Sequence, residues 1–297
     1  MSFKIDPNNL QNMVQRKVFE DPSGGLINLR IMFALIHMSH QSDLDDNKKS
    51  EVFDLILITA LKLTAVWQHL DRYSKLEDQL IKEAYEKPID ETENKFLNKP
   101  VRLETAQNLY LELDGLLVQF KSTLDHMVHI LHFTFGLPFE ALTTFGDNGN
   151  KIKTQLTRNV PGKWQQPAKQ ISNYIDQNQE WLKQVIDLRD KMNHYKSGGI
   201  RLDNFTVFVR KIDGKAVLYV PQIAKNQTVR EMMKNLLDSL ITFVEHFIAF
   251  SMMPKLSKFG LYYKIKDDPN AARWDLVPID QLRQYENDPS TKIMGET

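Results

Sequence analysis

The fold class of this chain rests on residues 50–87, which read SEVFDLILITALKLTAVWQHLDRYSKLEDQLIKEAYEK. Apolar side chains recur there every three or four residues, the spacing that places them along one face of a helix. These positions are Phe53, Ile56, Ala60, Leu63, Trp67, Leu70, Tyr73, Leu76, Leu80 and Ala84. The pattern predicts one long amphipathic helix that ends before Pro88, because proline cannot donate a helical hydrogen bond.

The same periodicity predicts three more long helices, at about residues 104–135, 167–196 and 228–253. Their ends carry the expected signals: a glycine and proline stop after the first, two glycines after the second, and a capping box before the third. These signals are Gly136-Leu137-Pro138, Gly198-Gly199 and Thr228-Val229-Arg230-Glu231. A short helix is expected within Leu26–His37, and residues 139–168, which are polar and contain three glycines, are expected to form a long loop.

Two β-rich runs, Phe205–Ile212 and Lys215–Val220, flank Asp213-Gly214, the strongest short-range signal for a β-hairpin. The sequence therefore predicts a mainly α protein, a bundle of four or five long helices with a hairpin at 203–221 before the last bundle helix. The expected domains are an N-terminal helical extension (1–100), the bundle (101–253) and a C-terminal extended tail (254–297). Two β-rich runs in this tail, at 259–265 and 274–279, are expected to be either short strands or extended chain.

Composition limits the functional classes. The chain has 297 residues and no cysteine, so a disulfide framework, a thiolate zinc site and a cysteine nucleophile are excluded. No cofactor is needed for folding at this length. The start lacks the apolar core of a signal peptide, and the apolar runs at 52–67 and 237–253 contain charged residues. We expect a soluble cytoplasmic protein without a membrane partner.

The net charge of zero hides a basic region. Residues 151–220 contain 13 Lys and Arg against 6 Asp and Glu, whereas residues 1–100 contain 13 against 16. Such a region can attract a polyanion such as RNA, although a charge surplus on solvated faces is also common.

The basic region contains residues 188–199, which read LRDKMNHYKSGG at the end of a predicted helix. Arg189 lies four residues after Val185 and so continues the apolar stripe, where a permanent charge is unusual and should face a cleft or an interface. Asp190 and His194 are four apart and adjacent on the helix surface. The carboxylate can fix the histidine tautomer, and the helix C-terminus favours imidazolium.

Cleavage of RNA needs a base for the 2′-hydroxyl, an acid for the leaving 5′-oxygen and positive charge at the phosphorane. A guanidinium meets the last need and a histidine can meet either proton-transfer need without a metal. A structural alternative stays open, because arginine and histidine near the end of a helix are also ordinary C-terminal capping residues.

The motif at 188–199 resembles the Arg-x4–6-His signature of the HEPN superfamily, and Gln119–His126, with its Leu124-Asp125 pair, resembles an earlier core helix of that family. The resemblance covers roughly residues 100–253. It implies a metal-independent endoribonuclease of defence or toxin systems, with Arg189 and His194 as catalytic residues and Asp190 as their polar helper. It also implies a homodimer in which two such pairs meet. The RNA contacts expected around this site are Lys191, Asn193, Tyr195 and Lys196.

The sequence departs from one HEPN toxin group, in which a tyrosine lies two residues after the histidine and is nucleotidylated by an antitoxin. Here Tyr195 follows His194 directly and Lys196 takes that place, so this mode of regulation is not expected, while an antitoxin or other regulatory partner stays open. Some HEPN proteins act only as binding modules, so a non-catalytic RNA-binding or protein-interaction module is the alternative function.

Histidines 126, 129 and 132 form the other histidine-rich stretch. Steps of three residues drift by about 60 degrees around a helix, so these rings do not converge on one ion as a three–four spacing would. No metal site is expected.

Overall fold

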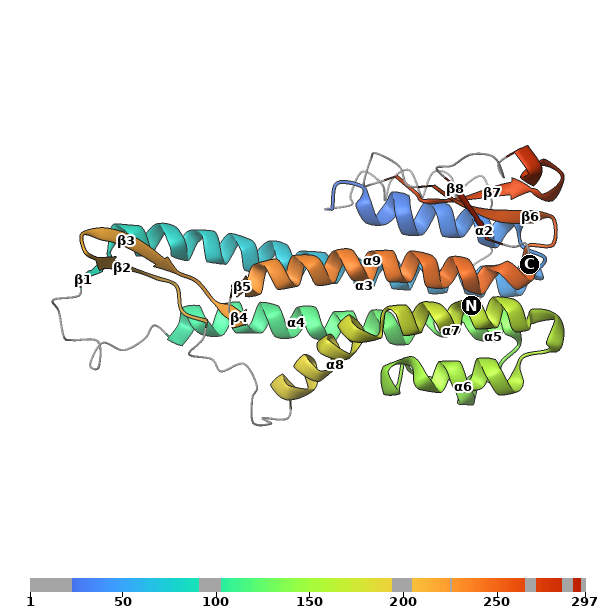
Figure 1. Ribbon diagram of the computed structural model, residues 1–297, viewed down its shortest axis with the longest axis horizontal. Coiled ribbons are helices and arrows are strands. Elements are labelled where there is room, and N and C mark those ends of the chain that lie inside the picture. The colour runs from blue at the N-terminus through green and yellow to red at the C-terminus, as the bar shows by residue number, and fades with distance from the viewer. Residues whose placement is uncertain are drawn as a thin grey trace. The chain divides into compact units, whose positions relative to one another are not determined.

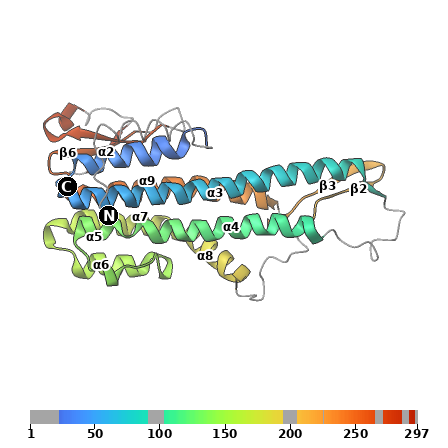
Figure 2. The same cartoon turned by 180° about the vertical axis from the view of Figure 1, so that it is seen from behind.

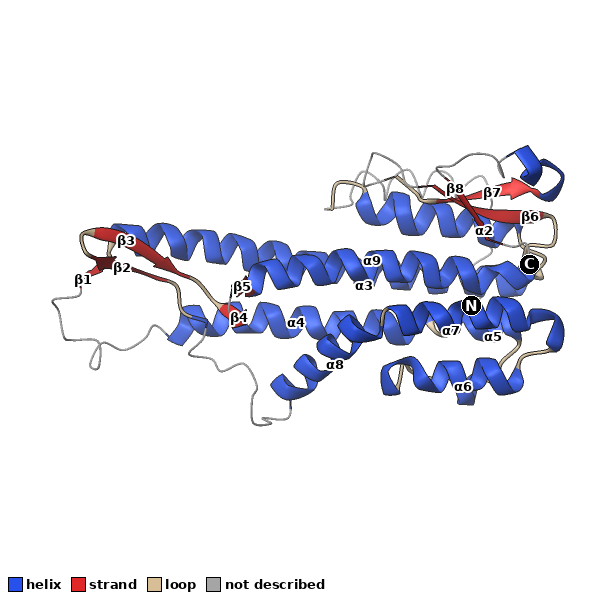
Figure 3. Cartoon of the chain, viewed as in Figure 1, coloured by secondary structure: helices blue, strands red, loops and turns tan. Residues whose placement is uncertain are grey.

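The computed structural model describes residues 23–90, 103–193, 205–224, 226–264, 271–284 and 291–294 (Figure 1). Within these residues the chain is mainly helical and carries short, mostly antiparallel strands (Figure 3), which confirms the predicted class. By its contacts the chain forms two compact units. Unit 1 comprises Met1–Thr64, Lys121–Leu182 and Leu240–Thr297, and unit 2 comprises Ala65–Phe120 and Lys183–Ser239.

Helix α3 (Asp46–Glu86) confirms the predicted first long helix. It begins four residues earlier than expected, where the Asp45 carboxylate accepts a hydrogen bond from the Lys48 backbone N–H at 3.0 Å. In unit 2, α3 lies beside α4 (Leu103–Met127) (Figure 2). The helices approach closely at Gly115, where an added Cβ would lie 2.3 Å from Cε1 of His69.

The second predicted long helix is divided into α4 and α5 (Ile130–Phe135). Between them the backbone tightens, because the N–H of His129 bonds to the carbonyl of His126 at 3.2 Å. The predicted glycine stop is confirmed: Gly136 follows α5 with φ at 69°, a left-handed conformation that glycine adopts without steric cost.

The prediction of a loop at 139–168 was wrong in part. This stretch contains α6 (Asn150–Asn159), and α7 (Gln165–Gln177) already begins within it. Only Ile152 and Leu156 of α6 are buried, so the apolar stripe of this helix is too short to stand out in the sequence. Lys153 bonds Asp176 of α7 at 2.6 Å, which ties the two helices together.

The predicted helix at 167–196 is also two helices, α7 and α8 (Gln179–Asn193). Asn178 lies between the two helices, and its side chain forms a hydrogen bond with a residue of each. Its amide nitrogen donates to the carbonyl of Tyr174 at 2.8 Å, and its side-chain oxygen accepts from the indole N–H of Trp181 at 2.7 Å. A single polar side chain thus stabilises a helix break that periodicity did not reveal.

The predicted hairpin is confirmed in unit 2. Strands β2 (Phe208–Ile212) and β3 (Lys215–Tyr219) pair antiparallel, and β1 (Ile89–Asp90) pairs parallel with β2. The turn residues Asp213 and Gly214 have φ values of 49° and 75°, as a two-residue hairpin turn requires. A second short pair, β4 (Gln222–Ala224) and β5 (Gln227–Thr228), follows the hairpin.

Helix α9 (Val229–Met252) begins at the predicted capping box. The Thr228 N–H donates to the Glu231 carboxylate at 3.0 Å, and the Glu231 N–H donates to the Thr228 hydroxyl at 3.2 Å. Of the described helices, the stretch Val229–Lys255 is long and apolar enough to cross a membrane, but 72% of its most apolar window is buried inside the protein. That burial is what a core helix shows.

The first and last described parts of the chain meet in unit 1. The predicted short helix is a π-helical turn, η1 (Asn28–Phe33), followed by α2 (Ala34–Gln41). The predicted C-terminal strands are present as β6 (Phe259–Lys264) and β7 (Trp274–Pro278), and β8 (Thr291–Met294) joins them. These three strands form an antiparallel sheet in the order β7-β6-β8, beside α2 (Figure 1).

A buried ion pair joins η1 to α9 in unit 1. The Arg30 guanidinium donates to one Glu245 carboxylate oxygen at 2.9 Å, and the two side chains are 5% and 0% exposed. The other carboxylate oxygen accepts the backbone N–H of Arg273 at 3.0 Å, and Thr242 accepts from Arg30 at 3.2 Å. Both charges are therefore hydrogen-bonded, as burial requires.

His246 should make unit 1 sensitive to acid. Burial, together with the nearby charges of Arg273 and Arg30, lowers the pKa of His246 to about 4, although its hydrogen bond to the Thr242 carbonyl acts in the opposite direction. An unfolded histidine titrates near 6.5, so between these pH values the unfolded chain binds more protons. The contribution of His246 to the free energy of unfolding is fully present above about pH 6.5. It should fall by about 2 to 3 kcal/mol as the pH drops toward 4. Urea unfolding across this range should show a smaller loss for His246→Phe, and equal losses would contradict the assignment.

Candidate functional site

The helix that carries the predicted site, α8, packs through one stripe of side chains. Leu182, Val185 and Met192 of this stripe are buried. Arg189 follows Val185 by four residues and precedes Met192 by three, so it lies on the same stripe. Its side chain is 33% exposed. A guanidinium thus lies half-buried on a packing face, where apolar side chains are the rule.

The contacts of the Arg189 guanidinium are few. One terminal nitrogen bonds to the neighbouring Asp190 carboxylate at 3.1 Å, and both side chains remain partly exposed. The Nε atom is buried and, among the residues that the structure describes, has no hydrogen-bond partner. A buried donor without a partner is costly. The exposed third of the side chain is the part that an acceptor such as a phosphate oxygen can reach.

The other predicted site residues fall at the edge of the described region. Lys191 is exposed on α8, and Asn193 is the last residue of that helix. His194, Tyr195 and Lys196 lie outside the described residues. The structure joins Asp190 to Arg189, and the expected contact between Asp190 and His194 stays a prediction.

Sequence reasoning missed a charged cluster between α3 and α4 in unit 2. His69 Nδ1 lies 2.6 Å from the Glu112 carboxylate, and Arg72 Nε lies 3.4 Å from the same oxygen. His69 and Glu112 are about 80% buried. The two residues are 43 positions apart, so no local spacing could have paired them. The His69 ring fills the space above Gly115, which is the geometry of an interhelical packing contact.

The row of histidines at 126, 129 and 132 is packed as part of unit 1. His132 is buried, with its two ring nitrogens 2.8 and 3.1 Å from the carbonyl oxygens of Leu137 and Leu142. The Phe139 ring stacks on the rings of His132 and His129, with centroid separations of 4.2 and 5.2 Å. Burial lowers the pKa of His126 and of His129. Among the described residues, no group of three or more His, Cys, Asp and Glu side chains could hold a metal ion.

Comparison with known proteins identifies no relative of this chain. The chain matches no protein-family model, and no curated protein and no solved structure matches it. The residues of α8, and the motif that they begin, are therefore the features of this chain that bear on its function.

Proposed function

We propose that this chain is a metal-independent endoribonuclease of the HEPN type, acting in the cytoplasm as a defence or toxin effector. Arg189 and His194 are the proposed catalytic residues. The observation that carries the proposal is the half-buried Arg189 guanidinium, whose Nε is buried without a partner among the described residues. The arginine begins the Arg-x4-His motif, and His194 follows the last residue of α8.

The proposed chemistry divides between the two residues. Arg189 binds the scissile phosphate and stabilises the charge of the phosphorane, for which its planar fork is suited. His194 transfers the proton to or from the reacting oxygens. One such pair is sparse for both proton transfers, so the active form is proposed to be a homodimer that brings two pairs together within the helical bundle. Lys191, Asn193, Tyr195 and Lys196 are the proposed RNA contacts.

One observation favours a second candidate function. Asp190 already binds the Arg189 guanidinium at 3.1 Å, which offsets part of the charge that a phosphate would meet. A non-catalytic RNA-binding or protein-interaction module would use the same basic surface without bond cleavage.

RNA cleavage by the purified full-length chain tests the proposal. Total cellular RNA and tRNA are incubated with wild type and with His194→Ala in the presence of a chelator. We expect wild type to release products that end in cyclic phosphate, and His194→Ala to lose about 10²- to 10⁴-fold in rate, the usual contribution of a general acid or base. RNA binding by both proteins without cleavage would instead establish the binding module.

A further inference from the structure

Two lysine side chains converge on one tryptophan ring in unit 1. Trp164 ends the short helical turn η4 (Gly162–Trp164), which leads into α7, and Lys255 ends the turn η6 (Met253–Lys255), which follows α9. The Lys163 ammonium nitrogen lies 4.8 Å from the centroid of the Trp164 ring, and the Lys255 ammonium nitrogen lies 4.3 Å from it. Such cation–π contacts attract an ammonium group without a counter-charge.

The backbone around these side chains is fixed by contacts within unit 1. The Trp164 ring meets the ring of Phe135 edge-on, with centroids 6.4 Å apart. The Lys255 carbonyl accepts the backbone N–H of Asp43 at 2.8 Å, and the Ser257 N–H donates to the Asp43 carboxylate at 3.1 Å. The two ammonium groups are therefore held at one place before any ligand arrives, which reduces the entropy that binding costs.

The two ammonium groups are close together and lack a direct counter-charge. Both nitrogens lie within 5 Å of one centroid, so they are less than about 10 Å apart, which is about one Debye length in 0.1 M salt. Their repulsion is therefore only partly screened. Among the described residues, neither the Lys163 nor the Lys255 side chain forms an ion pair or a hydrogen bond with a side chain. An anion that contacts both would relieve this repulsion.

The charged groups around Lys255 agree with this view. Burial and the charges of Lys48 and Lys163 lower the pKa of Lys255, while the Asp43 carboxylate acts in the opposite direction. Lys48 is itself paired with Asp45 at 2.8 Å. The two carboxylates offset part of the positive charge, but neither forms an ion pair with Lys163 or Lys255.

The segment that contains η4 adds further positive charge. Residues 151–175 contain five Lys and Arg and no Asp or Glu. Within the described part of the chain, Lys153 is the one member that forms an ion pair, with Asp176 of α7 at 2.6 Å. The other four are exposed: Lys151, Arg158, Lys163 and Lys169. A run of this kind suits an extended polyanion better than a single small anion.

We propose that Lys163 and Lys255 bind neighbouring phosphates of an RNA strand, and that the acid-free segment 151–175 extends this contact along the strand. The choice of RNA as the polyanion rests on the proposed nuclease function. Lysine meets a phosphate as a point charge, and phosphate contacts carry no sequence information. This surface of unit 1 thus holds the RNA backbone whatever its bases are, and Arg189 and His194 remain the residues that act on the scissile phosphate.

The test measures binding without cleavage. The probe is a fluorescently labelled 2′-O-methyl RNA oligonucleotide, which keeps the phosphates but lacks the free 2′-hydroxyl that the proposed cleavage needs. Its binding to the full chain is followed by fluorescence anisotropy at several salt concentrations. The alanine variant combines Lys163→Ala with Lys255→Ala, and a variant with arginine at both positions keeps the charges. The matched control combines Lys82→Ala with Lys234→Ala, which removes two exposed charges from unit 2.

We expect the alanine variant to bind the probe at least about tenfold more weakly than wild type in 0.1 M salt. The slope of log affinity against log salt should fall by about 1.4, because each phosphate contact on a single strand contributes about 0.7. The arginine variant and the matched control should bind like wild type. Probes made of adenine or of uracil alone should lose affinity equally, since the bases are not read.

Three results would overturn the inference. They are an absence of binding by wild type, an alanine variant that keeps a folded circular dichroism spectrum and binds like wild type, and an equal loss in the matched control. Displacement of the probe by polyglutamate as readily as by unlabelled RNA would also overturn it, in favour of an acidic protein partner. A wild type that binds as expected but leaves unmodified RNA intact would refute the nuclease proposal alone, so the two failures are distinguishable.

Discussion

Arg189→Ala is expected to lower the rate of RNA cleavage by about 10²- to 10³-fold, the usual cost of removing one preorganised donor from the developing charge of a transition state. The reason is the half-buried guanidinium with its buried, unpartnered Nε. Among the described residues the side chain makes one ion pair, with its neighbour Asp190, so its removal should change the stability by less than about 1 kcal/mol. Cleavage rates under single-turnover conditions, together with thermal unfolding, separate the two effects.

Two further variants control this experiment. Arg189→Lys keeps the charge but not the bidentate fork, and it should recover only part of the activity. Lys183→Ala removes an exposed charge from the same helix and should cleave RNA like wild type. Equal activity of Arg189→Ala and wild type would exclude Arg189 from the catalytic site, and an equal loss in Lys183→Ala would point to general charge instead.

Glu245→Ala is expected to destabilise the protein by about 3 to 5 kcal/mol, because it leaves the charge of Arg30 buried without its partner. The carboxylate is fully buried and accepts hydrogen bonds from the Arg30 guanidinium and from the Arg273 backbone. Both contacts are lost together. The measurement is urea unfolding at pH 7, followed by circular dichroism.

A double variant shows whether the pair itself or its disruption sets this loss. Arg30→Met with Glu245→Leu replaces both ions by apolar side chains, and it should be much more stable than Glu245→Ala. The comparison pair is Lys75 and Asp71 on the surface of α3, where Lys75 is 74% exposed. Lys75→Ala should cost less than about 1 kcal/mol. A loss below 1 kcal/mol in Glu245→Ala would falsify the role given to the buried pair.

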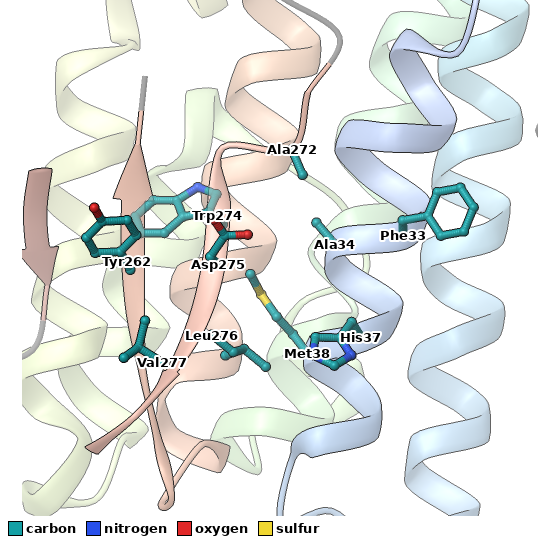
Figure 4. Close-up of a pocket in the computed structure, with 10 residues that line it drawn as sticks. All are labelled: Phe33, Ala34, His37, Met38, Tyr262, Ala272, Trp274, Asp275, Leu276 and Val277. Atoms are coloured by element: carbon teal, nitrogen blue, oxygen red, sulfur yellow. The ribbon is translucent and has the colours of Figure 1, made fainter. Parts of the chain in front are cut away.

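The Arg189 motif and the pocket between α2 and β7 (Figure 4) differ in how far the sequence alone could reach them. The Arg189 motif is local, since its residues follow one another on a single helix, and it is visible in the sequence as LRDKMNH. The pocket at α2 and β7 is not, because its walls are more than 200 residues apart and no spacing relates them. Only folding brings Met38 and Asp275 to the same cavity.

Local sequence patterns were enough to predict the elements whose cause lies within a few residues. The period of apolar residues predicted α3, the Asp213-Gly214 dipeptide predicted the hairpin, and the Thr228–Glu231 capping box predicted the start of α9. Each depends on neighbours within a few residues, through helical or strand periodicity and through turn and cap hydrogen bonds. The helix breaks at Asn178 and His129 were missed, because periodicity continues across a single turn.

Features that depend on partners distant in the sequence are set only in the folded chain. Helix α6 has too few apolar residues to be recognised alone and is tied to α7 by the bond between Lys153 and Asp176. Arg30 is an ordinary charge in the sequence, and becomes a core residue only because Glu245, 215 positions away, supplies its counter-charge. Burial and charge pairing are properties of the folded surroundings, and they cannot be read from the order of residues along the chain.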